Sequence, residues 1–146
     1  MRAVVQRVSR AEVSIGGEVE GSIGTGLLVF VGIRRGDDDA SCRWLCDKLL
    51  RLRVFGDAQG KMNRTVAEAG GGILLVSQFT LYGDVRKGNR PGFDDAAPPE
   101  VAEPLYDRMA AYLRGVSAVP VATGRFRAEM AVELVNEGPV TILLER

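Results

Sequence analysis

Two short segments carry the residue types from which a hydrolytic or binding site could be built. Residues Ser77 to Thr80 have the sequence Ser-Gln-Phe-Thr and follow a strongly apolar run, and residues 136–141 have the sequence Asn-Glu-Gly-Pro-Val-Thr. Hydroxyl groups can act as nucleophiles or can position a substrate. A Gly-Pro pair can present bare carbonyl groups to a small ligand, because glycine has no Cβ.

The absence of histidine limits the chemistry that these segments can perform. Without an imidazole, neither a Ser-His-Asp nor a Cys-His arrangement can be assembled. A nucleophilic Thr80 would need another base, and Lys48, Lys61 and Lys87 are the only lysines in the chain. Two interpretations therefore stay open for Ser77 and Thr80. Their hydroxyls either satisfy local backbone groups, or line a site that depends on backbone dipoles and on groups of the substrate.

The Gly138-Pro139 pair also has two interpretations. It separates two apolar-rich segments, 130–135 and 140–144, so the pattern alone favours a turn between two strands. However, X-Pro is the one kind of peptide bond in which the cis form is readily accessible. A kinked backbone that binds a ligand is therefore the alternative.

The two cysteines do not predict a metal site. Cys42 and Cys46 lie four residues apart, which places both on one face of a predicted helix. A structural metal site needs further ligands, and the chain has no histidine to supply them. We expect reduced, core-facing thiols and neither a metal nor an organic cofactor.

The length of the chain predicts a single domain over residues 1–146. Nineteen basic and nineteen acidic residues leave no net charge, which argues against a broad contact with nucleic acid but allows contact with a single-stranded end. There is no apolar run long enough to span a membrane and no signal-peptide pattern. We expect a cytoplasmic protein that does not contact membranes.

The apolar patterns predict an α+β fold with a mostly antiparallel sheet. The expected strands cover residues 2–15, 18–23, 27–31, 54–55, 73–79, 119–123 and 130–135, and the expected helices cover 40–53 and 98–114. The long segment 82–99 between the second apolar strand and the second helix is expected to be a functional loop.

Taken together, the two motifs closely resemble those of the D-aminoacyl-tRNA deacylase family. The likeness extends through most of the chain, including Gly60-Lys61-Met62-Asn63, Asn89-Arg90-Pro91 and Thr123-Gly124-Arg125-Phe126. The resemblance implies a barrel-like α+β domain with two helices, and a homodimer that hydrolyses the ester between a D-amino acid and the 3′ end of tRNA.

The resemblance also implies roles for individual residues. Ser77, Gln78, Phe79 and Thr80 would form the catalytic segment, placed beside Gly138 and Pro139 of the other subunit, with the Gly138-Pro139 bond cis. Arg7 would brace the Gly-Pro motif and Met130 would line the pocket; their alternatives are an exposed strand charge and a core thioether.

A mechanism without histidine follows from these roles. Backbone N–H groups near Phe79 and Thr80 would stabilise the oxyanion, an effect typically worth about 3–4 kcal/mol per donor, while the 2′-hydroxyl of the terminal ribose would activate water. Carbonyl groups of Gly138 and Pro139 would hold the substrate amine so that an L side chain collides with the backbone. Glycyl-tRNA, including glycine mischarged on tRNA(Ala), should then be cleaved and L-aminoacyl-tRNA should not.

Contacts with the tRNA end are expected from aromatic and basic residues of the long loop. Phe79 or Phe93 could stack on the terminal adenine, and Arg86, Lys87 and Arg90 could contact phosphates. The alternative for these cations is an ordinary solvated loop. The alternative function for the whole chain is a non-catalytic module that binds a nucleic-acid end or a small amine.

Overall fold

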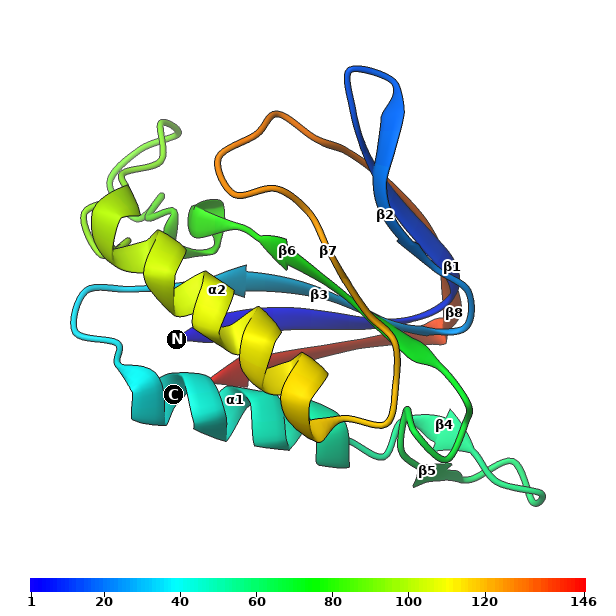
Figure 1. Ribbon diagram of the computed structural model, residues 1–146. Coiled ribbons are helices and arrows are strands. Elements are labelled where there is room, and N and C mark those ends of the chain that lie inside the picture. The colour runs from blue at the N-terminus through cyan, green and yellow to red at the C-terminus, as the bar shows by residue number, and fades with distance from the viewer.

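The computed structural model describes all 146 residues and has the predicted α+β architecture, with helices packed on one face of a strongly curved sheet (Figure 1). The elements in chain order are β1 (Arg2–Ile15), β2 (Glu18–Ile23), β3 (Gly26–Gly32), α1 (Asp39–Arg51), β4 (Phe55–Gly56), β5 (Met62–Arg64), β6 (Gly72–Ser77), the 3₁₀ helix η1 (Phe79–Tyr82), α2 (Pro99–Val116), β7 (Val121–Thr123) and β8 (Ala131–Glu145).

The main sheet is organised around the long strand β1. Its order is β2-β1-β3-β6-β7, with β8 paired to β1 as well. The first half of β1 pairs with β3 and the second half with β2, whereas β8 runs antiparallel to β1 along nearly its whole length. The pairs β3–β6 and β6–β7 are parallel. Parallel neighbours require crossover connections, and α1 and α2 lie within these two connections.

The sheet curls until β2 and β7, the first and last strands in this order, lie close together. A Cβ atom placed on Gly21 of β2 would lie only 2.7 Å from the Thr123 carbonyl oxygen of β7. Arg125, just after β7, also forms an ion pair with Glu20 of β2 at 2.7 Å. The domain is therefore nearly closed, which confirms the expected barrel-like form.

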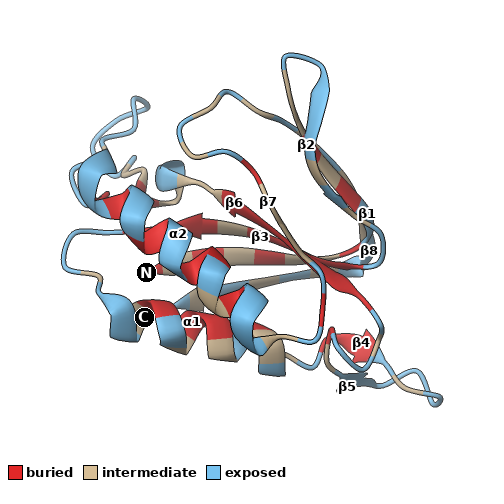
Figure 2. Cartoon of the chain, viewed as in Figure 1, coloured by how far each residue is buried: buried red, intermediate tan, exposed pale blue.

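Nearly all residues of the central strands β3 and β6 are buried (Figure 2). Leu27 and Val29 of β3 belong to a cluster of 24 buried residues between the sheet and the two helices. Leu28 points the other way, into a cluster of six buried residues that includes Val8 and Val76. Burial on both faces explains why β3 and β6 have continuous apolar runs instead of an alternating pattern.

Helix α1 begins within one residue of its expected start and packs with both cysteines inward. The Asp38 side chain accepts a hydrogen bond from the Ser41 amide at 2.9 Å, which caps the helix. Its inward face carries Cys42, Leu45, Cys46 and Leu49. Both cysteines are buried free thiols, which confirms the core-facing interpretation.

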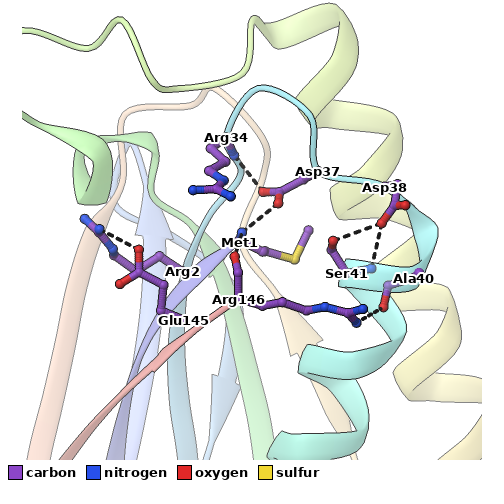
Figure 3. A network of polar contacts seen from close by, with 9 residues as sticks. All are labelled: Met1, Arg2, Arg34, Asp37, Asp38, Ala40, Ser41, Glu145 and Arg146. Carbon is purple, nitrogen blue, oxygen red and sulfur yellow. Dashed lines mark hydrogen bonds and ion pairs between the residues drawn. The ribbon is translucent and has the colours of Figure 1, made fainter.

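Polar contacts tie the start of β1 to the end of β8 (Figure 3). The Met1 amine donates hydrogen bonds to Asp37 Oδ1 at 2.7 Å and to the Arg146 carbonyl oxygen at 2.8 Å. Arg2 forms an ion pair with Glu145 at 2.7 Å. None of the helices has the length and apolar character that a membrane crossing requires.

Three local predictions need correction. The strand expected over 73–79 ends at Ser77, and residues from Phe79 onward form η1. The strand β5 was not predicted, because its residues are all exposed and carry no apolar alternation. The apolar segments on either side of Gly138-Pro139 belong to one strand, β8, instead of two strands joined by a turn.

Candidate functional site

Strand β8 contains a bulge at the Gly-Pro motif. Asn136 pairs with Val8 and Thr141 pairs with Gln6, so a single residue of β1 faces the four residues between them. We call residues 137–140 the Gly-Pro bulge. The strand continues in both directions from it, still paired with β1. The motif is therefore an exposed outward excursion of a strand, and the turn interpretation is wrong.

The backbone of the bulge has a conformation that only glycine adopts readily. Gly138 has a φ of +117°, and the peptide bond between Gly138 and Pro139 is cis. In the side-chain orientation that satisfies its hydrogen bonds, Asn136 Nδ2 donates to the Arg7 carbonyl oxygen at 2.9 Å and to the Val140 carbonyl oxygen at 3.2 Å. These bonds hold the base of the bulge against β1.

Arg7 is the residue of β1 that faces the bulge. Its Nε donates to the Glu137 carbonyl oxygen at 3.3 Å, and its Nη1 donates to the Val54 carbonyl oxygen. A Cβ atom on Gly138 would collide with Arg7 Nη2. The guanidinium group therefore fills the space beside Gly138 and links the bulge to the segment that precedes β4.

The Ser-Gln-Phe-Thr segment forms a second exposed feature, at the end of β6. Ser77 and Gln78 are half-buried, whereas Phe79 and Thr80 are exposed. The Gln78 amide nitrogen of the backbone donates to the Val31 carbonyl at 2.7 Å, and the Gln78 side chain donates to Thr80 Oγ1. Because Gln78 provides no side-chain cap, the first backbone N–H groups of η1 are available to a ligand.

Arg2 of β1 supports η1 through two contacts. Its Nη1 donates to the Leu81 carbonyl oxygen at 2.7 Å, and its guanidinium lies 4.8 Å from the centre of the Tyr82 ring. Neither Arg2 nor Val54 lies in a recognisable sequence motif. Arg2 supports the site through a long side chain and Val54 through its backbone carbonyl, so the sequence alone did not indicate either role.

Aromatic and basic residues of the following loop lie next to η1. The rings of Phe79 and Phe93 pack edge-to-face with centroids 5.0 Å apart. Asp84 and Gly92 pair through two backbone hydrogen bonds, which closes the loop that carries the exposed cations. The three expected phosphate contacts, Arg86, Lys87 and Arg90, are thus on the side of the molecule that carries Phe79.

Arg86 is already paired within this loop. Its guanidinium donates to both carboxylate oxygens of Asp84, at distances between 2.7 and 3.1 Å. These hydrogen bonds lower the pKa of Asp84 to about 2. The charge that this loop offers to a phosphate is accordingly smaller than its three cations indicate.

Met130 is half-buried. It packs against the cluster of six buried residues that contains both Val8, the neighbour of Arg7, and Val76, the residue immediately before Ser77. Its sulfur lies close to Gly124, where a Cβ atom would come within 2.7 Å. The backbone amide of Gly124 in turn donates to Leu75 of β6 at 3.0 Å.

A single chain does not bring the Gly-Pro bulge and η1 together. Arg7 pairs with Leu27, whereas Ser77 pairs with Val31, four residues further along β3. That offset corresponds to about 13 Å along the strands. The bulge on β8 is also separated from β6 by β1 and β3, or roughly 14 Å across the sheet.

No group of three or more cysteine, aspartate or glutamate side chains is arranged to hold a metal ion. Burial raises the pKa of Cys42 to about 11 and that of Cys46 to about 12, so both thiols stay protonated near neutral pH. They lie under α2, where Cys42 and Cys46 sulfurs face the Leu105 and Met109 carbonyl groups.

Comparison with known proteins gives a consistent family. A family model described as D-Tyr-tRNA(Tyr) deacylase matches residues 4–145. A protein of Symbiobacterium thermophilum named D-aminoacyl-tRNA deacylase is 61% identical over 99% of this chain and 95% of its own length. One of Anaeromyxobacter dehalogenans with the same name is 62% identical, over 99% of this chain and 97% of its own.

Two solved structures are similar over nearly the whole chain. One, described as c-Myc DNA Unwinding Element Binding Protein, has a TM-score of 0.95 and 44% identity, and covers 100% of this chain and 99% of its own. The other, described as a probable eukaryotic D-amino acid tRNA deacylase, has a TM-score of 0.82 and 21% identity over 98% of this chain and 97% of its own. The second shows a common fold.

Proposed function

Because the chain belongs to the D-aminoacyl-tRNA deacylase family, a family of hydrolases, we propose that it hydrolyses the ester joining a D-amino acid to the 3′ end of tRNA. The observation that carries this proposal is the exposed Gly-Pro bulge, braced by Arg7, in a chain whose relatives are 61% and 62% identical deacylases. We further propose that the enzyme acts in the cytoplasm.

The Gly-Pro bulge is proposed to bind the substrate amine. Its backbone is exposed and held on both sides by β1, so the carbonyl groups of Gly138 and Pro139 can stay fixed while a substrate enters. An α-ammonium group is a good partner for carbonyl oxygens, because a charged donor strengthens the hydrogen bond. Fixing the ammonium orients the Cα atom and its ester.

Chiral selection follows from this orientation. The side of the Cα atom that faces the bulge is occupied by protein backbone, so an L side chain collides there, whereas a D side chain points outward. Glycine has no side chain and enters as well. We therefore include glycyl-tRNA, and with it glycine mischarged on tRNA(Ala), among the substrates.

The η1 segment is proposed to stabilise the reaction. The uncapped N–H groups of Phe79 and Thr80 can donate to the oxyanion of the tetrahedral intermediate, which is worth about 3–4 kcal/mol per donor at other oxyanion sites. The ribose 2′-hydroxyl activates the attacking water, since the chain has no histidine. Thr80 positions the substrate and does not form an acyl intermediate; Ser77, Gln78, Met130 and Phe93 shape the surroundings.

The complete site is proposed to form between two copies of the chain. The separation of the bulge and η1 within one copy supports this assignment. Strand β8 is an edge strand that exposes apolar side chains, with Leu143 72% and Val135 42% exposed. Long, exposed apolar edge strands are usually covered by a partner. A homodimer would bury β8 and place η1 of one copy beside the bulge of the other.

A complementation experiment tests the shared site. A Gly138→Val chain, expected to be nearly inactive, and a Thr80→Val chain, expected to retain about a tenth of wild-type activity, are mixed and allowed to exchange subunits. In a symmetric dimer, each mixed dimer regains one intact site, so an equimolar mixture should recover about a quarter of wild-type activity. No recovery, from a mixture shown by mass spectrometry to contain mixed dimers, would contradict the shared site.

The activity is tested with charged tRNA and purified protein in the presence of EDTA. D-tyrosyl-tRNA and glycyl-tRNA should be hydrolysed, and L-tyrosyl-tRNA should stay intact beyond its spontaneous rate. Binding of D-tyrosyl-tRNA without release of free amino acid would instead support a non-catalytic module. Rapid hydrolysis of L-tyrosyl-tRNA would contradict the proposed orientation of the substrate.

A further inference from the structure

Four exposed basic residues lie close together in the chain at the end of α1 and in the β4–β5 hairpin. They are Arg51, Arg53, Lys61 and Arg64, which we call the hairpin patch. Figure 1 shows this hairpin extending beyond the C-terminal end of α1, away from α2. The function described above does not use these residues.

The positive charge of the hairpin patch is not neutralised by ion pairs. None of the five ion pairs in the chain includes a patch residue. Arg53 donates to the Asn63 carbonyl oxygen at 2.7 Å and to Asn63 Oδ1 at 2.9 Å, and Arg64 donates to the Glu68 carbonyl oxygen. Uncharged oxygens fix these guanidinium groups but leave their charge available to an anion.

The acidic groups of this region only partly offset the patch. Asp57 and Glu68 are the two acidic residues between positions 51 and 68, against four basic ones. Hydrogen bonds from Asn63 and the Lys61 amide lower the pKa of Asp57. Hydrogen bonds from Thr65, together with the nearby charges of Arg53 and Arg64, lower the pKa of Glu68. Both carboxylates therefore accept hydrogen bonds within their own turns. The local excess of positive charge is notable in a chain with no net charge.

The loop after η1, whose cations were expected to contact phosphates, carries less net positive charge than the hairpin patch. Residues 84–95 contain three basic and three acidic side chains. One of the three cations, Arg86, is held by both oxygens of Asp84. The hairpin patch is the more favourable surface for a polyanion. A cation that is already paired with a carboxylate neutralises less phosphate charge and so releases fewer counterions from the RNA.

The hairpin patch is joined directly to the Gly-Pro bulge. The Val54 carbonyl oxygen, next to Arg53, accepts a hydrogen bond from Arg7, and Arg7 contacts Gly138. An RNA whose aminoacyl end lies at the bulge must continue across the neighbouring surface. The hairpin offers positive charge on that surface.

We propose that the hairpin patch binds backbone phosphates of the tRNA whose aminoacyl end is held at the Gly-Pro bulge. This inference rests on the proposed function and adds the surface that holds the rest of the RNA. The contacts are to phosphate groups, so they do not select a sequence. They set the affinity for tRNA and its dependence on salt.

The test variant is Arg51→Gln/Lys61→Gln. Neither side chain forms a hydrogen bond or an ion pair in the structure, so the fold should be retained. The control is Arg43→Gln/Arg127→Gln, which removes the same charge from exposed positions that take part in no ion pair. Circular dichroism and thermal unfolding verify that both variants fold.

Two measurements are compared for these proteins. The first is the dependence of tRNA affinity on salt concentration, whose logarithmic slope should fall by about 2 in the test variant, since each phosphate contact contributes about 0.9. The second is kcat/KM for D-tyrosyl-tRNA divided by kcat/KM for D-tyrosyl-adenosine, which has the ester but no backbone phosphate. That ratio should fall by about tenfold in the test variant and stay unchanged in the control.

The outcomes separate the inference from the proposed function. If wild-type protein hydrolyses D-tyrosyl-tRNA and the test variant matches the control in both measurements, the hairpin patch does not bind phosphate and the inference is wrong. If wild-type protein does not hydrolyse D-tyrosyl-tRNA at all, the proposed function itself has failed. A slope that falls instead in Arg86→Gln/Lys87→Gln/Arg90→Gln would assign the phosphates to the other loop.

Discussion

The Arg7 guanidinium occupies the space in which a side chain on residue 138 would lie. A Cβ atom at that position would collide with Arg7 and would lie 2.9 Å from a methyl carbon of Val140. The φ of Gly138, +117°, is also one that other residues rarely adopt. Glycine is therefore required at position 138 by its conformation and by the lack of space.

We expect Gly138→Ala to impair both stability and catalysis. The backbone conformation alone should cost about 1–2 kcal/mol, and displacement of Arg7 should reduce D-tyrosyl-tRNA hydrolysis by about a hundredfold. Gly17→Ala is a matched control, because Gly17 has a φ of +89° but no atom near its missing side chain. Thermal unfolding and single-turnover hydrolysis are measured. Equal activity in the two variants would refute the role of the bulge.

Arg7→Lys should reduce activity although it keeps the positive charge. A lysine ammonium cannot reproduce the planar fork that reaches both Glu137 and Val54. We expect kcat/KM for D-tyrosyl-tRNA to fall between about tenfold and a hundredfold, with weaker discrimination against L-tyrosyl-tRNA. Arg10→Lys, at an exposed position of the same strand, should behave as wild type. Unchanged discrimination in Arg7→Lys would make Arg7 a structural residue only.

Phe79→Ala should affect binding of tRNA more than it affects the fold. Phe79 is 57% exposed and contacts Phe93 at its edge, so its removal should cost no more than about 1.5 kcal/mol of stability. Loss of a stacked base typically costs about 1–3 kcal/mol, so KM should rise by about tenfold. Val85→Ala removes a similarly exposed apolar side chain from the neighbouring loop and serves as the control. A KM that is identical in both variants would exclude stacking by Phe79.

Thr80→Ala should retain measurable turnover. If Thr80 only positions the substrate, loss of one hydrogen bond should reduce the rate by about tenfold. If Thr80 were the nucleophile, the variant would lose the chemical step entirely, and the wild type would show an acyl-enzyme burst. Rapid-quench kinetics on both proteins distinguish the two cases, with Thr80→Ser as a variant that keeps the hydroxyl.

The buried thiols should make the fold sensitive to alkaline pH. Burial raises the pKa of Cys42 to about 11 and that of Cys46 to about 12. The pKa of a thiol in the unfolded chain is about 8.5. The unfolded state then binds fewer protons above that pH, so the free energy of unfolding should decrease as pH rises from about 8.5 to 11. Urea unfolding measures this slope. The Cys42→Ala/Cys46→Ala variant should show a smaller slope, whatever its absolute stability.

The sequence was sufficient to predict the elements whose burial is regular. The predicted bounds of β1 and β2 agree with the observed ones, because β-branched residues and a Gly16-Gly17 turn mark these strands. The helices α1 and α2 followed from acidic and proline residues at their starts and from an apolar stripe. Local patterns are reliable where the local preference and the tertiary environment agree.

The same patterns could not predict the form of the Gly-Pro motif. A Gly-Pro pair between two apolar segments has the composition of a turn, yet both segments pair with β1, since Val8 and Gln6 face Asn136 and Thr141. That pairing depends on contacts more than a hundred residues apart in the chain, which local propensity does not contain. The resemblance to a family indicated a functional role for the motif, and the structure gives its geometry.

Because β8 pairs with β1 on both sides of residues 137–140, this region is a candidate for redesign. Asn136 and Val140 both lie on the inner, half-buried face, so an even number of residues could be added or removed between them without turning Ile142 and Leu144 outward. An odd number would turn the following side chains to the opposite face of the sheet and expose Ile142 and Leu144. The Gly-Pro bulge could therefore be lengthened or shortened in steps of two residues while the rest of the domain keeps its register.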